Sequence, residues 1–292
     1  ANALVGNKAG EAVLEMLALG PLFIVEADSV QLALVGSAVG LRLDGRAIEA
    51  GRSVTVERGA KVAVTGFTDS ACCYLAVGGG FDLEPVMGSN STYARGGFGG
   101  LGRLLKRDDT LPLRRRSAPA GPERCAEPIP YGDGPIRIIL GPQADWFEPD
   151  SLSRFFSDPY DITAEADRMG MRLAGPALRH SRGFNIASDG IATGAVQVPG
   201  TGQPILLLAD HQTIGGYPKL GTVASADLPR LGRCRPGQQL RFTPIETEAA
   251  EALRREQERA FRRMVDRIAP IATVPRSEDL LSANLISGVV SA

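Results

Sequence analysis

Apolar and polar residues alternate in several short segments near the start of the chain, which is the two-residue period of β-strands. Residues 53–57 and 61–65 both show this alternation, and the Arg-Gly-Ala turn between them predicts a hairpin. Residues 74–77 form a further short apolar strand that ends at three consecutive glycines. The pattern predicts a first lobe, residues 1–113, made of short strands and tight turns.

A proline-rich stretch, residues 114–135, separates this lobe from the rest of the chain. It shows little periodicity, so no regular element is expected there. Because a residue before proline favours extended conformations, we expect a fairly stiff linker. Strand and turn spacing then resumes and predicts a second β lobe over residues 136–245.

Two segments have helical character. Residues 1–18 resemble a helix already under way, so we expect further residues upstream of Ala1. Residues 247–268 change to a helical period, with an apolar stripe opposite Arg/Glu pairs, and predict an amphipathic helix within a C-terminal segment of residues 246–292. The stripe either docks on the chain's own second lobe or binds a partner.

Composition agrees with a mainly β protein. The chain has 292 residues, 43% of them hydrophobic, which is enough for two domains with substantial cores. Its 35 glycines and 20 prolines favour many short strands joined by turns.

Charge and cysteine content exclude several classes of protein. The 32 Lys+Arg and 33 Asp+Glu leave a net charge of −1, so we expect neither nucleic acid nor acidic lipid as a partner. No stretch reaches the roughly 18 apolar residues of a membrane span. Four cysteines without a CxxC pair, and two histidines, predict reduced thiols in a cytoplasmic protein with no metal site.

The segment 97–102 matches the pattern GxGxxG, but its surroundings do not suit a dinucleotide fold. No buried strand precedes it, no long helix follows it, and Pro122 stands where an acidic residue is expected. Ser91, Tyr93 and Arg95 just before it predict a loop that binds an anion or a carboxylate. A plain glycine-rich surface loop is the alternative.

The densest group of polar residues follows a fully apolar strand at residues 205–209. Glutamine amides both donate and accept hydrogen bonds, so Gln197 and Gln203 suit the recognition of a substrate amide. Asp210 could accept a proton, and Lys219 could stabilise developing negative charge. The alternative is structural, with Asp210 capping a turn and Lys219 solvated.

Two neighbouring groups are less suited to catalysis. Asp210 and His211 are adjacent in an extended segment, so their side chains should point to opposite faces and not bond to each other. The segment 167–172 carries an acid and two arginines, which we expect to pair internally more readily than to bind a carboxylate. His180 has no supporting group nearby in sequence and is expected to be a surface or packing residue.

Four ordered motifs, at residues 88–100, 188–191, 194–200 and 208–219, resemble the allophanate hydrolase subunit 2 family of the biotin-dependent carboxyltransferases. The resemblance extends from Ala1 to about Phe242 and resumes in the tail. It implies two cyclophilin-like β-barrel lobes with short helices. The family also has a segment with a Gln-Asp-x-Gly-Arg motif before the position of Ala1.

The resemblance further implies an enzyme subunit that acts with a smaller homologous subunit of the allophanate hydrolase subunit 1 type. The expected activity is ATP-dependent 5-oxoprolinase, which converts 5-oxoproline to glutamate with a third, lactam-utilisation subunit. One alternative is carboxyl transfer from carboxybiotin, supplied in trans with a biotin carboxylase or carrier, to urea. The others are a non-catalytic regulator that binds a kinase inhibitor and, from the barrel type alone, a prolyl isomerase. No Ala-Met-Lys-Met segment for covalent biotin and no Walker lysine motif is present, so this chain binds no cofactor covalently.

Matching positions to the motifs gives the candidate site. Three catalytic candidates are Asp210, Tyr217 and Lys219. The substrate-binding candidates are Gln197, Gln203, Gln212, Thr213, Gly215 and Gly216, with Ser91, Tyr93 and Arg95 as a second group.

Overall fold

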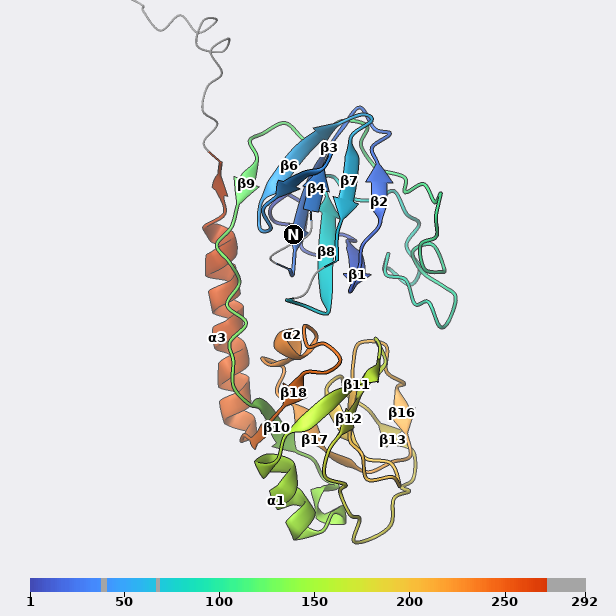
Figure 1. The fold of residues 1–292 in the computed structure, drawn as a ribbon, viewed down its shortest axis with the longest axis vertical. Helices are drawn as coiled ribbons and strands as arrows, with labels where there is room; N and C mark the ends of the chain where they lie inside the picture. The colour runs from blue at the N-terminus through green and yellow to red at the C-terminus, as the bar shows by residue number, and fades with distance from the viewer. Residues whose placement is uncertain (38–40, 67–68, 272–292) are drawn as a thin grey trace, which may run out of the picture.

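The computed structural model describes residues 1–37, 41–66 and 69–271. Two β-rich lobes lie end to end, and the long helix α3 (Thr247–Asp266) runs beside both of them (Figure 1). The expected fold class, mainly β with short helices and a C-terminal amphipathic helix, is confirmed.

The first lobe consists of two antiparallel sheets of four strands each. Their strand orders are β1-β8-β3-β6 and β2-β7-β4-β5. The strands are β1 (Leu14–Leu17), β2 (Leu22–Ile24), β3 (Ser29–Val35), β4 (Leu41–Leu43), β5 (Arg46–Ile48), β6 (Ser53–Glu57), β7 (Lys61–Val64) and β8 (Cys72–Val77).

Alternating valines build the core between these sheets. Val54 and Val56 of β6 are buried together with Val62 and Val64 of β7, while polar residues between them face outward. The strands and their turn are as predicted, but the predicted hairpin is wrong. β6 pairs with β3, and β7 pairs with β2 and β4, so the chain crosses from one sheet to the other at this turn. Alternation places a strand against a core but does not say which strand lies beside it.

The helix predicted for residues 1–18 is also wrong. Gly6 has a φ of +72°, which a right-handed helix does not accommodate. Leu4 and Val5 are buried against Ala33 and Ala76 from a turn segment, and the remaining residues lead into β1. Burial of these two side chains therefore replaces the expected helix.

The second lobe is one eight-stranded sheet with the order β18-β11-β12-β15-β14-β17-β10-β19. Its two end strands are separated in the chain by Arg241 alone, whose carbonyl accepts the N–H of Ile136 at 2.7 Å, so the sheet nearly closes into a barrel. The strands are β10 (Ile136–Leu140), β11 (Tyr160–Ala166), β12 (Gly170–Ala174), β14 (Ala195–Gln197), β15 (Ile205–Leu207), β17 (Lys219–Val223), β18 (Gln239–Leu240) and β19 (Phe242–Pro244).

Aromatic side chains fill one end of this barrel. Phe155 of α1 (Pro149–Ser157) stacks on Phe242 with ring centroids 4.5 Å apart, and the buried Tyr160 donates to the carbonyl of Pro176 at 2.8 Å. Smaller elements of the lobe are the 3-10 turn η1 (Ala144–Trp146), the helix α2 (Leu228–Leu231), and the paired strands β13 (Asp189–Gly190) and β16 (Ile214–Gly215).

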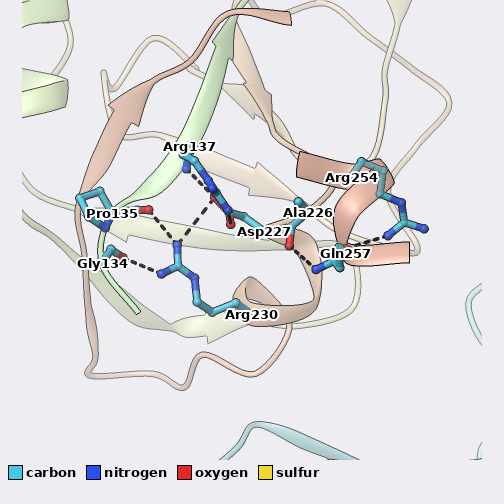
Figure 2. A network of polar contacts seen from close by, with 8 residues as sticks. All are labelled: Gly134, Pro135, Arg137, Ala226, Asp227, Arg230, Arg254 and Gln257. Atoms are coloured by element: carbon cyan, nitrogen blue, oxygen red, sulfur yellow. Dashed lines mark hydrogen bonds and ion pairs between the residues drawn. The ribbon is translucent and has the colours of Figure 1, made fainter. Parts of the chain in front are cut away.

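Helix α3 agrees with the sequence prediction and connects the lobes. Gln257 donates to the carbonyl of Ala226 at 2.7 Å in the second lobe (Figure 2). Past the helix, β20 (Ala269–Pro270) pairs with β9 (Arg124–Cys125) of the linker. The apolar stripe docks on the second lobe at Ala250, but Phe261 remains 53% exposed.

The short strand β9 differs from the expectation of a linker without regular elements. Prolines 122 and 128 bracket five residues that have free backbone N–H groups, and this is where pairing occurs. None of the helices in the described ranges is both long and apolar enough to cross a membrane.

Candidate functional site

The second lobe presents a polar loop, residues 208–219, between strands β15 and β17. The apolar strand ends at Leu207, and the backbone then turns, with the N–H of Asp210 donating to the carbonyl of Arg168 at 2.8 Å. Further along, β16 pairs with β13 before the loop enters β17 at Lys219. The loop thus brings its first and last residues to two different places.

The first place is a buried group that we term the lysine–amide cluster, formed by Gln143, Asp189, Gln197, Gln212 and Lys219. The Nζ of Lys219 donates to Asp189 Oδ2 at 2.6 Å and to the carbonyl of Gly190 at 2.9 Å. Gln197 lies opposite Lys219 in the β14–β17 register, and its Oε1 is 3.5 Å from Gln212 Nε2. Lys219 and Gln197 are 8% and 3% exposed.

Electrostatics in this cluster centre on one ion pair. The hydrogen bond from Lys219 is the main cause that lowers the pKa of Asp189, with smaller contributions from the N–H of Gly190 and the amide of Gln143. The Oε1 of Gln143 also accepts the backbone N–H of Lys219 at 3.3 Å. The cluster therefore combines a cation with amide groups, which suits a planar substrate carrying a carbonyl oxygen and an N–H.

Gly215 leaves room for these amides. A Cβ at this position would lie 2.7 Å from Gln197 Nε2, closer than real contacts allow. The absence of a side chain is therefore required for the observed position of Gln197.

The second place is a cleft between the lobes, which we term the inter-lobe cleft. Arg168 binds Asp210 through two hydrogen bonds, Nε to Oδ2 at 2.8 Å and Nη2 to Oδ1 at 3.0 Å. Its Nη1 also donates to Glu15 of the first lobe. Asp210 and Glu15 together raise the pKa of the Arg168 guanidinium. Asp210 is thus tied to the first lobe through a shared arginine.

A cavity of about 230 Å³ lies beside this ion pair. Residues of both lobes line it, among them Met87, Ser91, Tyr93, Phe98, Arg168 and Asp210.

The glycine-rich loop shapes the first-lobe wall of the cleft. Tyr93 pairs with Phe98 through a backbone bridge, and their rings meet edge to face with centroids 5.4 Å apart. Gly99, with a φ of +72°, lies against the backbone of Ser91 and leaves no space for a Cβ. Arg95 donates to Asp167 at 2.8 Å and does not line the cavity, so its guanidinium already has a carboxylate partner.

Several expected site residues join neither group. The amide of Gln203 bonds to the backbone of Gly175 in both directions, at 3.0 and 3.1 Å, so it has a structural partner. Tyr217 is 40% exposed. Thr213 takes part through its backbone carbonyl, which accepts the N–H of Ile191, and Gly216 lies nearest to the carbonyl of Ile186.

The histidines follow the sequence reasoning. His211 contacts the carbonyl of Gln212 and the hydroxyl of Thr193, and not Asp210. His180 packs beside Phe147 and contacts the carbonyl of Val198 at 3.2 Å. Over the residues that the structure describes, no set of three or more His, Cys, Asp or Glu side chains is placed to hold a metal ion.

Sequence reasoning expected one convergent site, whereas the structure has two groups. Within the described ranges, no side-chain hydrogen bond or ion pair joins Asp210 to Lys219. The polar segments that contain Asp189 and Arg168 stand out in the sequence, but their spacing assigns neither residue a site role, and Gln143 is missed. Gln143 follows the apolar strand β10 through a Gly-Pro turn, the same strand-then-polar signal that singles out Asp210.

Known proteins resemble this chain over most of its length. Residues 1–244 match the family described as carboxyltransferase domain, subdomain A and B. The chain is 35% identical to the C subunit of the Escherichia coli 5-oxoprolinase over 92% of its own length and 86% of that protein.

Larger relatives contain this chain as a part. Urea amidolyase of Saccharomyces cerevisiae is 27% identical over 98% of this chain, which spans only 17% of that protein. The crystal structure of the K. lactis urea amidolyase superimposes with a TM-score of 0.81 and 25% identity, over 94% of this chain and 18% of that one.

Proposed function

The chain belongs to the carboxyltransferase family of subdomains A and B, and from this membership we propose that it is a subunit of an enzyme that processes a lactam. The proposed reaction is ATP-dependent hydrolysis of 5-oxoproline to glutamate, in which water is added across the ring amide. The enzyme is completed by a smaller homologous subunit and a lactam-utilisation subunit. The relatives named above, from 5-oxoprolinase and from urea amidolyases, support a role within a multicomponent enzyme.

The observation that carries the proposal is the lysine–amide cluster. A lactam offers one carbonyl oxygen and one N–H in a plane, and the cluster offers an ammonium donor with two glutamine amides that both donate and accept. Lys219 would stabilise negative charge on the carbonyl oxygen as water attacks. Gln197 and Gln212 would orient the ring amide.

Length ranks hydrolysis above the other reactions. The chain spans 86% of the bacterial 5-oxoprolinase relative, which is a separate polypeptide, but only 17% of a yeast urea amidolyase. Carboxyl transfer from carboxybiotin to urea is the second candidate, favoured by the urea amidolyase likeness. The ureido ring of biotin is also planar, so the same two glutamines could hold it. In either case other components supply ATP or carboxybiotin.

Reconstitution tests the proposal. The chain is combined with both partner subunits, and ATP-dependent glutamate formation from 5-oxoproline is measured. Gln212→Ala should lower kcat/KM about fivefold to tenfold, because one hydrogen bond to a neutral group is worth about 1 kcal/mol. Gln239→Ala, an exposed glutamine on β18, should leave kcat/KM unchanged.

Parallel assays separate the alternatives. Activity only with urea, bicarbonate, biotin carboxylase and biotin carrier would favour carboxyl transfer. If the subunits assemble and neither assay shows turnover, the hydrolase proposal fails and the regulator alternative is favoured.

A further inference from the structure

The ammonium of Lys219 is buried but has one exposed partner. Its side chain is 10% exposed, whereas that of Asp189 is 55% exposed. Over residues 1–37, 41–66 and 69–271, Asp189 is the only carboxylate within ion-pair distance of Nζ. A buried ammonium without a counter-charge is strongly disfavoured, so this single carboxylate decides the state of the lysine.

The geometry leaves one N–H of Lys219 for a ligand. An ammonium has three N–H donors, and two of them go to Asp189 Oδ2 and the carbonyl of Gly190. Both acceptors belong to β13, which is held in place by its pairing with β16. The lysine is therefore oriented from one side by a short, fixed strand.

The groups on the other sides of Lys219 are uncharged. Gln197 faces it from β14, Gln143 contacts its backbone from the turn before η1, and β10 pairs alongside through Leu140 and Gly221. The nearest titratable ring belongs to His211, which contacts Gln212 and Thr193. Asp189 is thus the charged group that can tune Lys219.

We propose that Asp189 is a positioning residue that keeps Lys219 charged and aims its remaining N–H at the substrate carbonyl oxygen. The inference rests on the proposed function for the role of Lys219, but the pairing itself can be tested without turnover. Geometry alone makes the pair, since the two groups meet at 2.6 Å at the end of one short strand. The low pKa of Asp189 is consistent with a carboxylate that stays ionised at neutral pH.

The sequence provides an unusually clean assay. The chain has four lysines, and the other three, Lys8, Lys61 and Lys106, are exposed. Acetic anhydride acetylates only uncharged amines, so the acetylated fraction of each lysine, read by mass spectrometry against pH, reports its ammonium separately. The three exposed lysines serve as internal standards in every sample.

Asp189→Asn should lower the pH of half-acetylation of Lys219 by at least one unit relative to the internal standards. Asp189→Glu should restore most of the wild-type value, and Asp161→Asn, an exposed residue on β11, should leave it unchanged. In the reconstituted enzyme, the basic limb of the pH–rate profile should move to lower pH in Asp189→Asn and return in Asp189→Glu. Circular dichroism checks that each variant is folded.

An unchanged acetylation profile in folded Asp189→Asn would overturn the positioning role. If the profile shifts but wild-type enzyme shows no lactam turnover, the proposed function fails while the control of Lys219 by Asp189 stands. If it shifts and activity is lost without movement of the pH–rate profile, the charge of Lys219 is not what catalysis uses, and the inference is likewise overturned.

Discussion

Gly215 shows how a single residue without a side chain can set the geometry of a site. A Cβ there would meet Gln197 Nε2 and Ile191 Cδ1, each at 2.7 Å. Gln197 is almost fully buried, so its amide has little space to move away. The backbone of Gly215 does not have a positive φ, so the space for Gln197, and not the backbone conformation, accounts for glycine here.

Gly215→Ala should therefore displace the amide of Gln197 and lower kcat/KM of the reconstituted enzyme by on the order of tenfold to a hundredfold, the effect expected of a misplaced substrate contact. Gly10→Ala is the matched control, since a Cβ there meets nothing within 4 Å. Equal kinetics for the two variants would show that the Gln197 amide does not contact substrate.

At this scale the sequence predicts residue chemistry better than residue partnership. Lys219, Gln197 and Gln212 lie together as expected, because they are placed around one apolar strand and its polar continuation. Asp210 was expected in the same group, but its carboxylate binds Arg168 instead. That partner lies 42 residues away in the chain, and sequence spacing gives no distance across a sheet.

Among the elements, a buried ion pair joins the first strand of the barrel to the turn before α2. Arg137 of β10 binds Asp227 through its backbone N–H at 2.8 Å and its Nε at 2.9 Å (Figure 2). Arg230 lies on the other side, with its guanidinium on the carbonyls of Gly134 and Pro135. Burial raises the pKa of Asp227, but the hydrogen bonds from Arg137 outweigh this effect, and the pKa is lowered overall.

Asp227→Asn should destabilise the fold by about 2 kcal/mol at pH 7, less than a fully buried pair because Arg137 is partly exposed. A lowered pKa means that the pair stabilises the fold above the unfolded pKa of about 4 and that this contribution is lost as pH falls below it. Urea unfolding from pH 7 to pH 3 should therefore give a smaller acid loss in Asp227→Asn than in wild type. Asp161→Asn should follow wild type, and parallel curves for Asp227→Asn would contradict this role.

Element types were predictable where one strong period ran through a segment, as in α3, β6 and β7. Partners were not. The valines of β6 and β7 would serve a hairpin or two facing sheets equally well, and residues 1–18 contain enough Leu and Ala to suggest a helix that Gly6 then prevents. Pairing in β9 depends on a segment more than 140 residues later, which no local pattern reveals.

For the whole molecule, the orientation of the two lobes decides whether the inter-lobe cleft exists. Its cavity is lined from both sides, and Glu15 of the first lobe shares Arg168 with Asp210. The mainly β architecture with a barrel-like second lobe could be anticipated from turn spacing and family resemblance. The contacts between the lobes could not, because they consist of single side chains that reach far across the chain.

Arg233 provides the most extensive of these contacts and allows a direct test. Its guanidinium donates to the carbonyl of Gly36, donates to the carbonyl of Asp69 at 3.2 Å, and lies 4.0 Å from the ring centroid of Tyr131 in the linker. Its own carbonyl accepts the N–H of Ala71 at 2.8 Å, and this bond survives substitution. One side chain from beyond α2 thus joins the first lobe, the linker and the second lobe.

Arg233→Ala should weaken the contact between the lobes by about 2 kcal/mol, since hydrogen bonds from a charged donor and a cation–π contact are lost together. Calorimetry should show the single unfolding transition broaden or split, and solution scattering should show a larger radius of gyration as the lobes separate. Arg241→Ala is the control, because this arginine donates to Ser157 within the second lobe alone. If both variants keep the wild-type radius and one sharp transition, the lobes are held chiefly by α3 and β20 instead, and truncation before residue 246 should then separate them.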